Sequence, residues 1–236
     1  MNIVISQPML FPWVGMFEQI RLADIYVHYD DVQFSKGSFT SRVQIKTPDG
    51  FKWLIIPLKD VKVGKNINEY ETDNKNNWRN QHIEFLKQIY KKAPFFNEMF
   101  QIVNEVYALK TDNLSEILIC GLDKVSKYLE FSPDKTYHKS SELMIKGVSS
   151  ERVFDIVRYF EGTNYITGHG AKNYLDHQLF DNNNIEVSYM DYQKNPYPQL
   201  YGEFNPYVSI LDLIANVGKE ATQYITSGTQ SWKKII

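Results

Sequence analysis

The chain has 236 residues, enough to bury a substantial core in one large domain or two small ones. A formal net charge of -2 argues against a general nucleic-acid binder or membrane-surface binder. The sequence has no charged-then-apolar leader and no run of about 18 apolar residues, so we expect neither a signal peptide nor a membrane span. The single cysteine, Cys120, excludes an intrachain disulfide and fits a cytoplasmic location. Its apolar neighbours predict a buried, unreactive thiol.

The amino-terminal stretch has the pattern of a strand, a loop, a helix and a second strand. Residues 2–6 predict a strand, and two prolines prevent the loop after them from continuing it. Residues 16–23 have the apolar spacing of a helix, and residues 25–30 form a second apolar run that ends in Asp30 and Asp31. In open α/β sheets ligands bind at the carboxyl ends of the strands. The loop and the two carboxylates are therefore the first place to expect a site.

The middle of the chain predicts a hairpin followed by helices. Two β-like runs, 42–46 and 51–57, flank a Pro-Asp-Gly turn, and a further short strand is predicted over 68–72. Asp112 is the predicted cap of the last helix in this region. The three helical patterns cover residues 73–92, 95–109 and 114–129.

The carboxy-terminal half returns to alternating strands and helices. This alternation at both ends of the chain predicts a Rossmann-like α/β fold, with a parallel sheet and helices on both faces. We expect one domain over 1–236, with a helical insertion at about 74–130 and a Pro/Tyr-rich carboxy-terminal segment. The remaining predicted strands are 135–138, 164–167 and 185–190, and the remaining helices are 149–160, 173–180 and 208–216.

The first group of candidate site residues joins the loop to the end of the second strand. Its two adjacent carboxylates have the chemistry to bind a cation, orient a hydroxyl or act as a base. Neighbouring residues of a strand face opposite ways, so at most one carboxylate faces a given site, and such a pair also caps loops. The group comprises Gln7, Pro12, Trp13, Gly15, Asp30, Asp31, Gln33 and Lys36.

A second group follows the strand at 164–167. Glycines allow close backbone approach to a ligand, and a helix start offers free N–H groups to phosphate, although a simple tight turn has the same sequence pattern. His169 adds a titratable group. This group comprises Gly168, His169, Gly170, Lys172 and Tyr174. We expect it to share one pocket with the loop at 7–15, because both follow strands of the same parallel sheet.

A third group lies in the Pro/Tyr-rich segment. Prolines stiffen this segment, and its tyrosines either line a pocket or only pack against the core. The group comprises Asp191, Tyr192 and Gln199. No Cys/His spacing typical of zinc, no P-loop and no GxSxG motif occurs, so no metal site is evident.

The chain resembles the WbqC-like family in several distinctive stretches that are distributed over nearly its whole length. The stretches are 5–8, 11–17, 29–34, Arg42, 53–57, Tyr90, Pro94, 168–175, 190–192 and 209–213. Genes of that family are typically associated with O-antigen and other surface-polysaccharide loci. The resemblance therefore implies work on nucleotide-linked sugars, often amino sugars.

A weaker resemblance links the chain to the HIGH-motif nucleotidyltransferases, which include pantothenate synthetase-like ligases and have a HUP-like fold. These enzymes also begin with a strand, a proline-containing loop, a helix and a strand that leads to a Gln-Phe pair. Their histidines stabilise charge on the transferred phosphates. Trp13 and Gly15 stand here in place of the His-x-Gly-His pattern, a departure that puts ATP-dependent adenylation in question.

The preferred hypothesis is a cytoplasmic transferase of O-antigen or lipopolysaccharide biosynthesis that acylates a nucleotide-linked amino sugar, with a donor such as acyl-CoA. Asp30, Asp31 or His169 would be the base, and Lys36 and Arg42 would hold phosphate. A noncatalytic nucleotide-sugar carrier or scaffold and an adenylate-forming ligase with a degenerate HIGH loop stay open as alternatives. The expected partner is a small-molecule nucleotide sugar, not nucleic acid, and an oligomer is compatible with the sequence.

Overall fold

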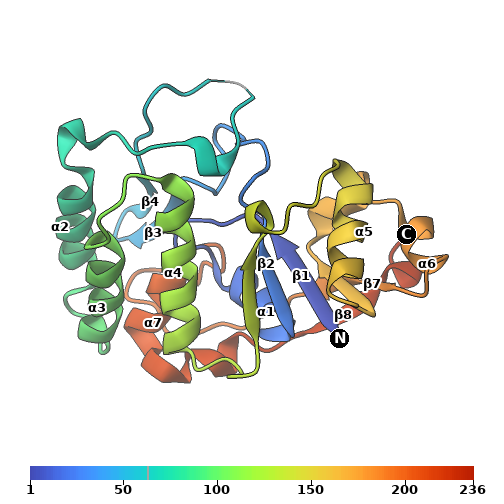
Figure 1. Cartoon of the computed structure of the whole chain (residues 1–236). Coiled ribbons are helices and arrows are strands. Elements are labelled where there is room, and N and C mark those ends of the chain that lie inside the picture. The colour runs from blue at the N-terminus through green and yellow to red at the C-terminus, as the bar shows by residue number, and fades with distance from the viewer. Residues whose placement is uncertain (63) are drawn as a thin grey trace.

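A six-stranded sheet and a separate two-stranded hairpin organise the chain (Figure 1). The computed structural model describes residues 1–62 and 64–236. The strand order of the sheet is β5-β2-β1-β6-β7-β8. The strands are β1 (Asn2–Ser6), β2 (Ile25–His28), β5 (Thr136–Lys139), β6 (Asn164–Thr167), β7 (Glu186–Asp191) and β8 (Gly228–Ser231).

The first five of these strands run parallel, as the sequence predicts. The sixth, β8, pairs antiparallel with β7, with Ser188 opposite Ser231. Its sequence, Gly-Thr-Gln-Ser, is polar and mostly exposed, so it has no apolar pattern from which a strand is predicted.

Alternating side chains of the sheet enter two separate cores. On β1, Val4 belongs to one core while Ile3 and Ile5 belong to the other. The first core includes side chains of α1 (Val14–Leu22), α4 (Leu114–Tyr128) and α7 (Ile210–Val217). The second includes side chains of α5 (Ser149–Tyr159) and α6 (His177–Asp181). The mostly parallel sheet is therefore covered by helices on both faces (Figure 1).

The segment between β2 and β5 holds the hairpin of β3 (Arg42–Thr47) and β4 (Gly50–Ile55), followed by α2 (Trp78–Tyr90), α3 (Phe96–Tyr107) and α4. His82 of α2 joins these parts, since Nδ1 lies 2.9 Å from the hydroxyl of Tyr107 and Nε2 lies 3.0 Å from the carbonyl oxygen of Ile55. Burial lowers the pKa of His82 to about 4. The imidazole is thus neutral and structural at pH 7.

Short helices depart most from the sequence-based prediction. The helix predicted from residue 73 starts as a 3-10 turn, and α2 begins only after Asn77, whose left-handed φ of 46° interrupts the helix. Asn113, not Asp112, caps α4, and its side chain accepts a hydrogen bond from the Glu116 N–H at 3.1 Å. The predicted strand over 68–72 is a 3-10 turn and isolated bridges, and the helix predicted over 173–180 is a 3-10 turn followed by α6.

Cys120 is half-buried, not buried as predicted, because it lies on the flank of α4 while Leu118 and Leu122 point into the core. Burial raises the pKa of its thiol. We expect a disulfide reagent to label the folded protein roughly tenfold more slowly than the urea-unfolded protein at pH 8, since the thiolate is the reactive form. Stopped-flow labelling measures both rates. Equal labelling rates for the folded and the unfolded protein would contradict the expectation. Cys120→Ser, which has no thiol, is the control for labelling at other groups.

Among the described residues, none of the helices combines the length and the apolar composition that crossing a membrane requires.

Candidate functional site

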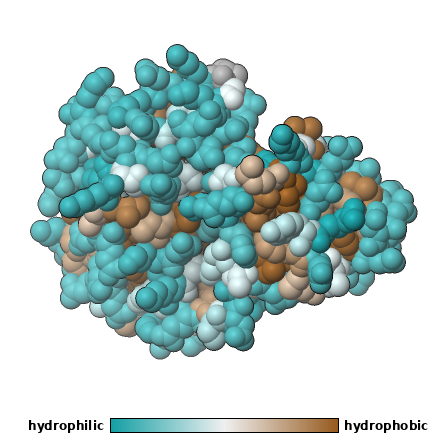
Figure 2. All heavy atoms as spheres, in the orientation of Figure 1, coloured by the Kyte–Doolittle hydropathy of each residue, from teal (hydrophilic) through white to brown (hydrophobic). Residues whose placement is uncertain are grey.

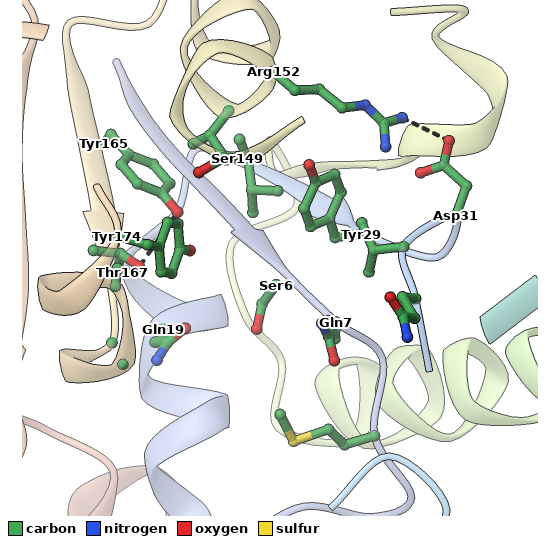
Figure 3. A pocket seen from close by; sticks show the side chains of 18 of the residues that line it. Ser6, Gln7, Gln19, Tyr29, Asp31, Ser149, Arg152, Tyr165, Thr167 and Tyr174 are labelled. Atoms are coloured by element: carbon green, nitrogen blue, oxygen red, sulfur yellow. Dashed lines mark hydrogen bonds and ion pairs between the residues drawn. The ribbon is translucent and has the colours of Figure 1, made fainter. Parts of the chain in front are cut away.

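A pocket of about 820 Å³ opens at the carboxyl ends of β1, β2 and β6 (Figure 3). The order of the strands explains its position. From β1 the chain adds β2 and β5 on one side, and it then adds β6 and β7 on the other. Where the order reverses, the connections leave on opposite faces and a crevice remains between the strand ends, which is where ligands bind in such sheets. The volume suits a small organic molecule.

The loop after β1 and the turn after β6 line this pocket together, as the sequence predicts. Gln7 and Trp13 come from the loop, and Gly168 and Gly170 come from the turn. Tyr174, four residues after Gly170, also lines the pocket. The prediction of one shared pocket is confirmed.

Trp13 is held in place by three neighbours. Its indole lies against Gly15, where an added Cβ would stand 2.3 Å from the nearest ring atom. The ring of Tyr192 meets the indole edge-on, with ring centroids 5.0 Å apart, and Tyr207 lies 6.1 Å away. Gly15 and Tyr192 are therefore not pocket walls themselves but determine where the indole stands.

Asp31 is held by hydrogen bonds at the wall of the pocket. Arg152 Nη2 donates to Asp31 Oδ2 at 2.6 Å (Figure 3). The Ser140 hydroxyl donates to Oδ1 at 2.5 Å. Burial opposes the charge of Asp31, but these hydrogen bonds outweigh it and keep the pKa of the carboxyl below its ordinary value. Asp31 is thus ionised at neutral pH.

Asp30 points the other way, as the alternation of side chains along an extended chain requires. Its buried carboxylate accepts hydrogen bonds from the Ser141 N–H and the Ser141 hydroxyl at 3.0 and 2.8 Å. The Ser140 hydroxyl, 3.2 Å away, shares its one proton between Asp30 and the nearer Asp31. Asp30 lies outside the pocket and fixes the 3-10 turn Ser140–Glu142.

The cationic and imidazole groups selected from the sequence also lie outside the pocket. Arg42 stacks on Trp53, 4.2 Å from the ring centroid, and Lys36 is exposed. His169 stacks on Tyr189, with ring centroids 5.8 Å apart, and the amine of Lys172 lies 5.5 Å from the centre of the same ring.

Three further candidates from the sequence have structural contacts. Pro12 is buried, and its carbonyl oxygen accepts a hydrogen bond from the N–H of the first residue of α7 at 2.8 Å. Asp191 ends β7 and pairs with the first residue of β8. The side-chain oxygen of Gln199 accepts hydrogen bonds from the amine of Lys46 and the N–H of Asn205.

Several pocket residues have no signal in the sequence. Gln19 lies one helical turn after Gly15 on α1, and Asn66 lies in the segment that follows the hairpin. With Gln7 and the predicted Gln33, they make four amide side chains around one pocket. The polar lining also includes Ser6, Tyr29, Ser149, Arg152, Tyr165 and Thr167.

The rim of the pocket near α5 is partly apolar. Val148, which precedes α5 and lines the pocket, is 76% exposed, and Met144 in the same connection is 83% exposed. On the face shown in Figure 2, hydrophobic side chains gather between α4 and α5 within a mostly hydrophilic surface. In the part of the chain that the structure describes, no group of three His, Cys, Asp or Glu side chains is arranged to hold a metal ion.

A model of the WbqC-like protein family matches residues 7–224. The chain belongs to this family. It is 31% identical over 227 residues to a protein of Mycobacterium tuberculosis (strain ATCC 25618 / H37Rv) called Uncharacterized protein Rv1507c, covering 95% of this chain and 97% of that relative. No solved structure matches this WbqC-like chain. The relative's name states no activity.

Proposed function

We propose that the pocket binds a nucleotide-linked amino sugar and that the protein is a transferase of surface-polysaccharide (O-antigen) biosynthesis that acylates the amine of that sugar. The substrate class comes from the family resemblance. The observation that supports it is the pairing, in one pocket, of a fixed indole with four amide side chains. An indole stacks on a base or a sugar ring, and amides both donate to and accept from hydroxyl groups and base edges.

In the proposed reaction the amine attacks the carbonyl carbon of a donor such as acyl-CoA. An N–C bond forms, the C–S bond breaks, and the thiol leaves while the amine loses a proton. Asp31 is the one carboxylate on the pocket wall among the described residues. Because it is ionised, it suits the role of proton acceptor and of partner for the amine. The proposal includes a Rossmann-like (HUP-like) fold and a cytoplasmic location, both of which are compatible with this reaction.

A noncatalytic nucleotide-sugar carrier is the second candidate, and one observation favours it. Hydrogen bonds from Arg152 and Ser140 lower the basicity of Asp31, while Asp30 and His169 lie outside the pocket. A carrier needs only the binding surface. Turnover separates the two candidates, because a transferase adds the mass of the acyl group to the sugar and a carrier does not. Release of pyrophosphate from ATP would instead indicate the adenylate-forming ligase.

Trp13→Ala should weaken binding of the nucleotide sugar about 10- to 100-fold, the range that loss of one stacked ring predicts. A thermal-shift screen of nucleotide-linked amino sugars first selects the ligand, because a ligand at 100 times its Kd stabilises the folded state by about 2.7 kcal/mol. Isothermal titration then compares the variants. Trp53→Ala is the control, since Trp53 is also half-buried but stacks on Arg42 outside the pocket. No ligand in the screen, or equal losses in both variants, would reject the proposal.

A further inference from the structure

Arg152 is the one cationic side chain on the pocket wall within the described part of the chain. It lies one turn into α5, and its side chain is 8% exposed. A buried guanidinium is unfavourable unless it is paired and hydrogen-bonded. Asp31 pairs with Nη2 at 2.6 Å, and Nε donates to the carbonyl oxygen of Ile145 at 3.0 Å. These two contacts fix the plane of the guanidinium.

The remaining edge of the guanidinium faces the pocket. In Figure 3 the nitrogen that is not bonded to Asp31 points down beside Tyr29, whose ring centroid lies 5.1 Å from the central carbon of the guanidinium. Arginine offers five N–H groups in a rigid planar fork that matches phosphate oxygens. A fork held on one edge by Asp31 and Ile145 therefore presents its other edge in a fixed direction.

We propose that Arg152 is the phosphate anchor of this pocket. The inference rests on the proposed nucleotide-sugar ligand and adds the residue that holds its diphosphate. The beginning of α5 supports the same position, because residues 147–149 line the pocket and the first turn of a helix directs N–H groups and a positive dipole end toward an anion. Arg42, Lys36 and Lys172 lie outside the pocket, so they leave this role to Arg152.

The charges on the pocket wall also define the ligand. Arg152 and Asp31 are the two charged side chains there among the described residues, and they neutralise each other. An anion without an amine gains from Arg152 and loses a part of that gain to Asp31, so it binds more weakly than a ligand that has both groups. A ligand that places a phosphate beside Arg152 and an amine beside Asp31 satisfies both groups. A nucleotide-linked amino sugar has this combination of charges.

Inorganic pyrophosphate tests the anchor without any assumption about base or sugar. We expect isothermal titration to show that pyrophosphate binds the wild-type protein and that Arg152→Gln weakens binding at least tenfold. Arg152→Lys should retain part of the affinity, since the charge is kept but the fork is lost. Arg158→Gln is the matched control, because Arg158 is on the same helix, is exposed and lies outside the pocket. It should bind pyrophosphate like the wild type.

A second measurement covers the case in which Arg152→Gln does not fold. In the NMR spectrum of ¹⁵N-labelled protein, the arginine Nε signal that is missing from Arg152→Lys belongs to Arg152. Pyrophosphate titrated into the wild-type protein should shift this signal and leave the Arg158 signal in place. Three results would overturn the inference: equal pyrophosphate affinity in the wild type and Arg152→Gln, an unshifted Arg152 signal, or no binding at 10 mM pyrophosphate. A Kd of about 10 mM is the weakest affinity that a useful anchor would have. If pyrophosphate binding requires Arg152 but no nucleotide sugar binds, the proposed function fails and the anchor stands.

Discussion

Replacing Asp212 with asparagine should remove about 3 kcal/mol of pH dependence from the free energy of unfolding between pH 4 and pH 7. Asp212 lies on α7 and is 1% exposed. The hydroxyls of Tyr90 and Tyr197 each donate to one of its carboxylate oxygens at 3.0 Å. Burial raises the pKa of Asp212 from 3.8 to about 6, against the opposing effects of these hydrogen bonds and of Lys46.

The direction of the effect follows from the two pKa values. The folded protein binds the proton of Asp212 more tightly than the unfolded chain does, since the folded pKa is the higher one. The stabilisation by this proton is fully present below pH 3.8 and is lost as the pH rises through 6. A shift of about two pKa units corresponds to about 3 kcal/mol. An asparagine side chain at this position cannot ionise, yet its amide can still hydrogen-bond to both tyrosine hydroxyls.

Urea unfolding at several pH values between 4 and 7 measures the difference between the wild type and Asp212→Asn, so that other titrating groups cancel. The variant should gain stability relative to the wild type as the pH rises. Asp49→Asn is the control, because Asp49 is exposed in the hairpin turn. A constant difference between wild type and Asp212→Asn across this range would contradict the expectation.

The parallel sheet could be predicted from the sequence because most of its parallel strands are apolar and because helical segments separate them along the chain. Residues 25–28 and 164–167, for example, are half-buried or buried throughout. The elements that escaped prediction depend on contacts with distant parts of the chain. β8 is polar, and it forms a strand because β7 offers it an edge. The late start of α2 has a local cause instead, because Asn77 ends the 3-10 turn through its own backbone conformation, which an apolar pattern does not predict.

The site was predictable to the extent that strand ends of a parallel sheet must meet. This rule placed Gln7, Trp13 and Gly168 at one pocket, and the structure agrees. It does not say which of two adjacent carboxylates faces inward. Nor does it predict that Asp31 pairs with an arginine 121 residues away, since Arg152 carries no motif. The cations chosen from the sequence, Lys36, Arg42 and Lys172, do not line the pocket.

Gly15→Ala should weaken binding of the nucleotide sugar at least tenfold without unfolding the protein. An added Cβ would stand 2.3 to 2.6 Å from three atoms of the Trp13 ring, closer than atoms can approach. The indole is rigid and is confined by Tyr192, so it has to turn out of its present position. Gly15 is on α1, where alanine favours the helix by about 1 kcal/mol, so the helix itself should not suffer.

Gly170→Ala is the matched control for this change. Gly170 lines the same pocket, and an added Cβ there meets no atom within 4 Å. Isothermal titration with the ligand selected by the thermal-shift screen, together with the tryptophan fluorescence of each variant, separates the outcomes. If the position of Trp13 determines affinity, Gly15→Ala should approach the affinity of Trp13→Ala and change the fluorescence, whereas Gly170→Ala should do neither. Normal affinity in Gly15→Ala, with its fluorescence changed, would show that the ligand does not stack on the indole and would move the ring-binding part of the pocket to Tyr29 or Tyr174.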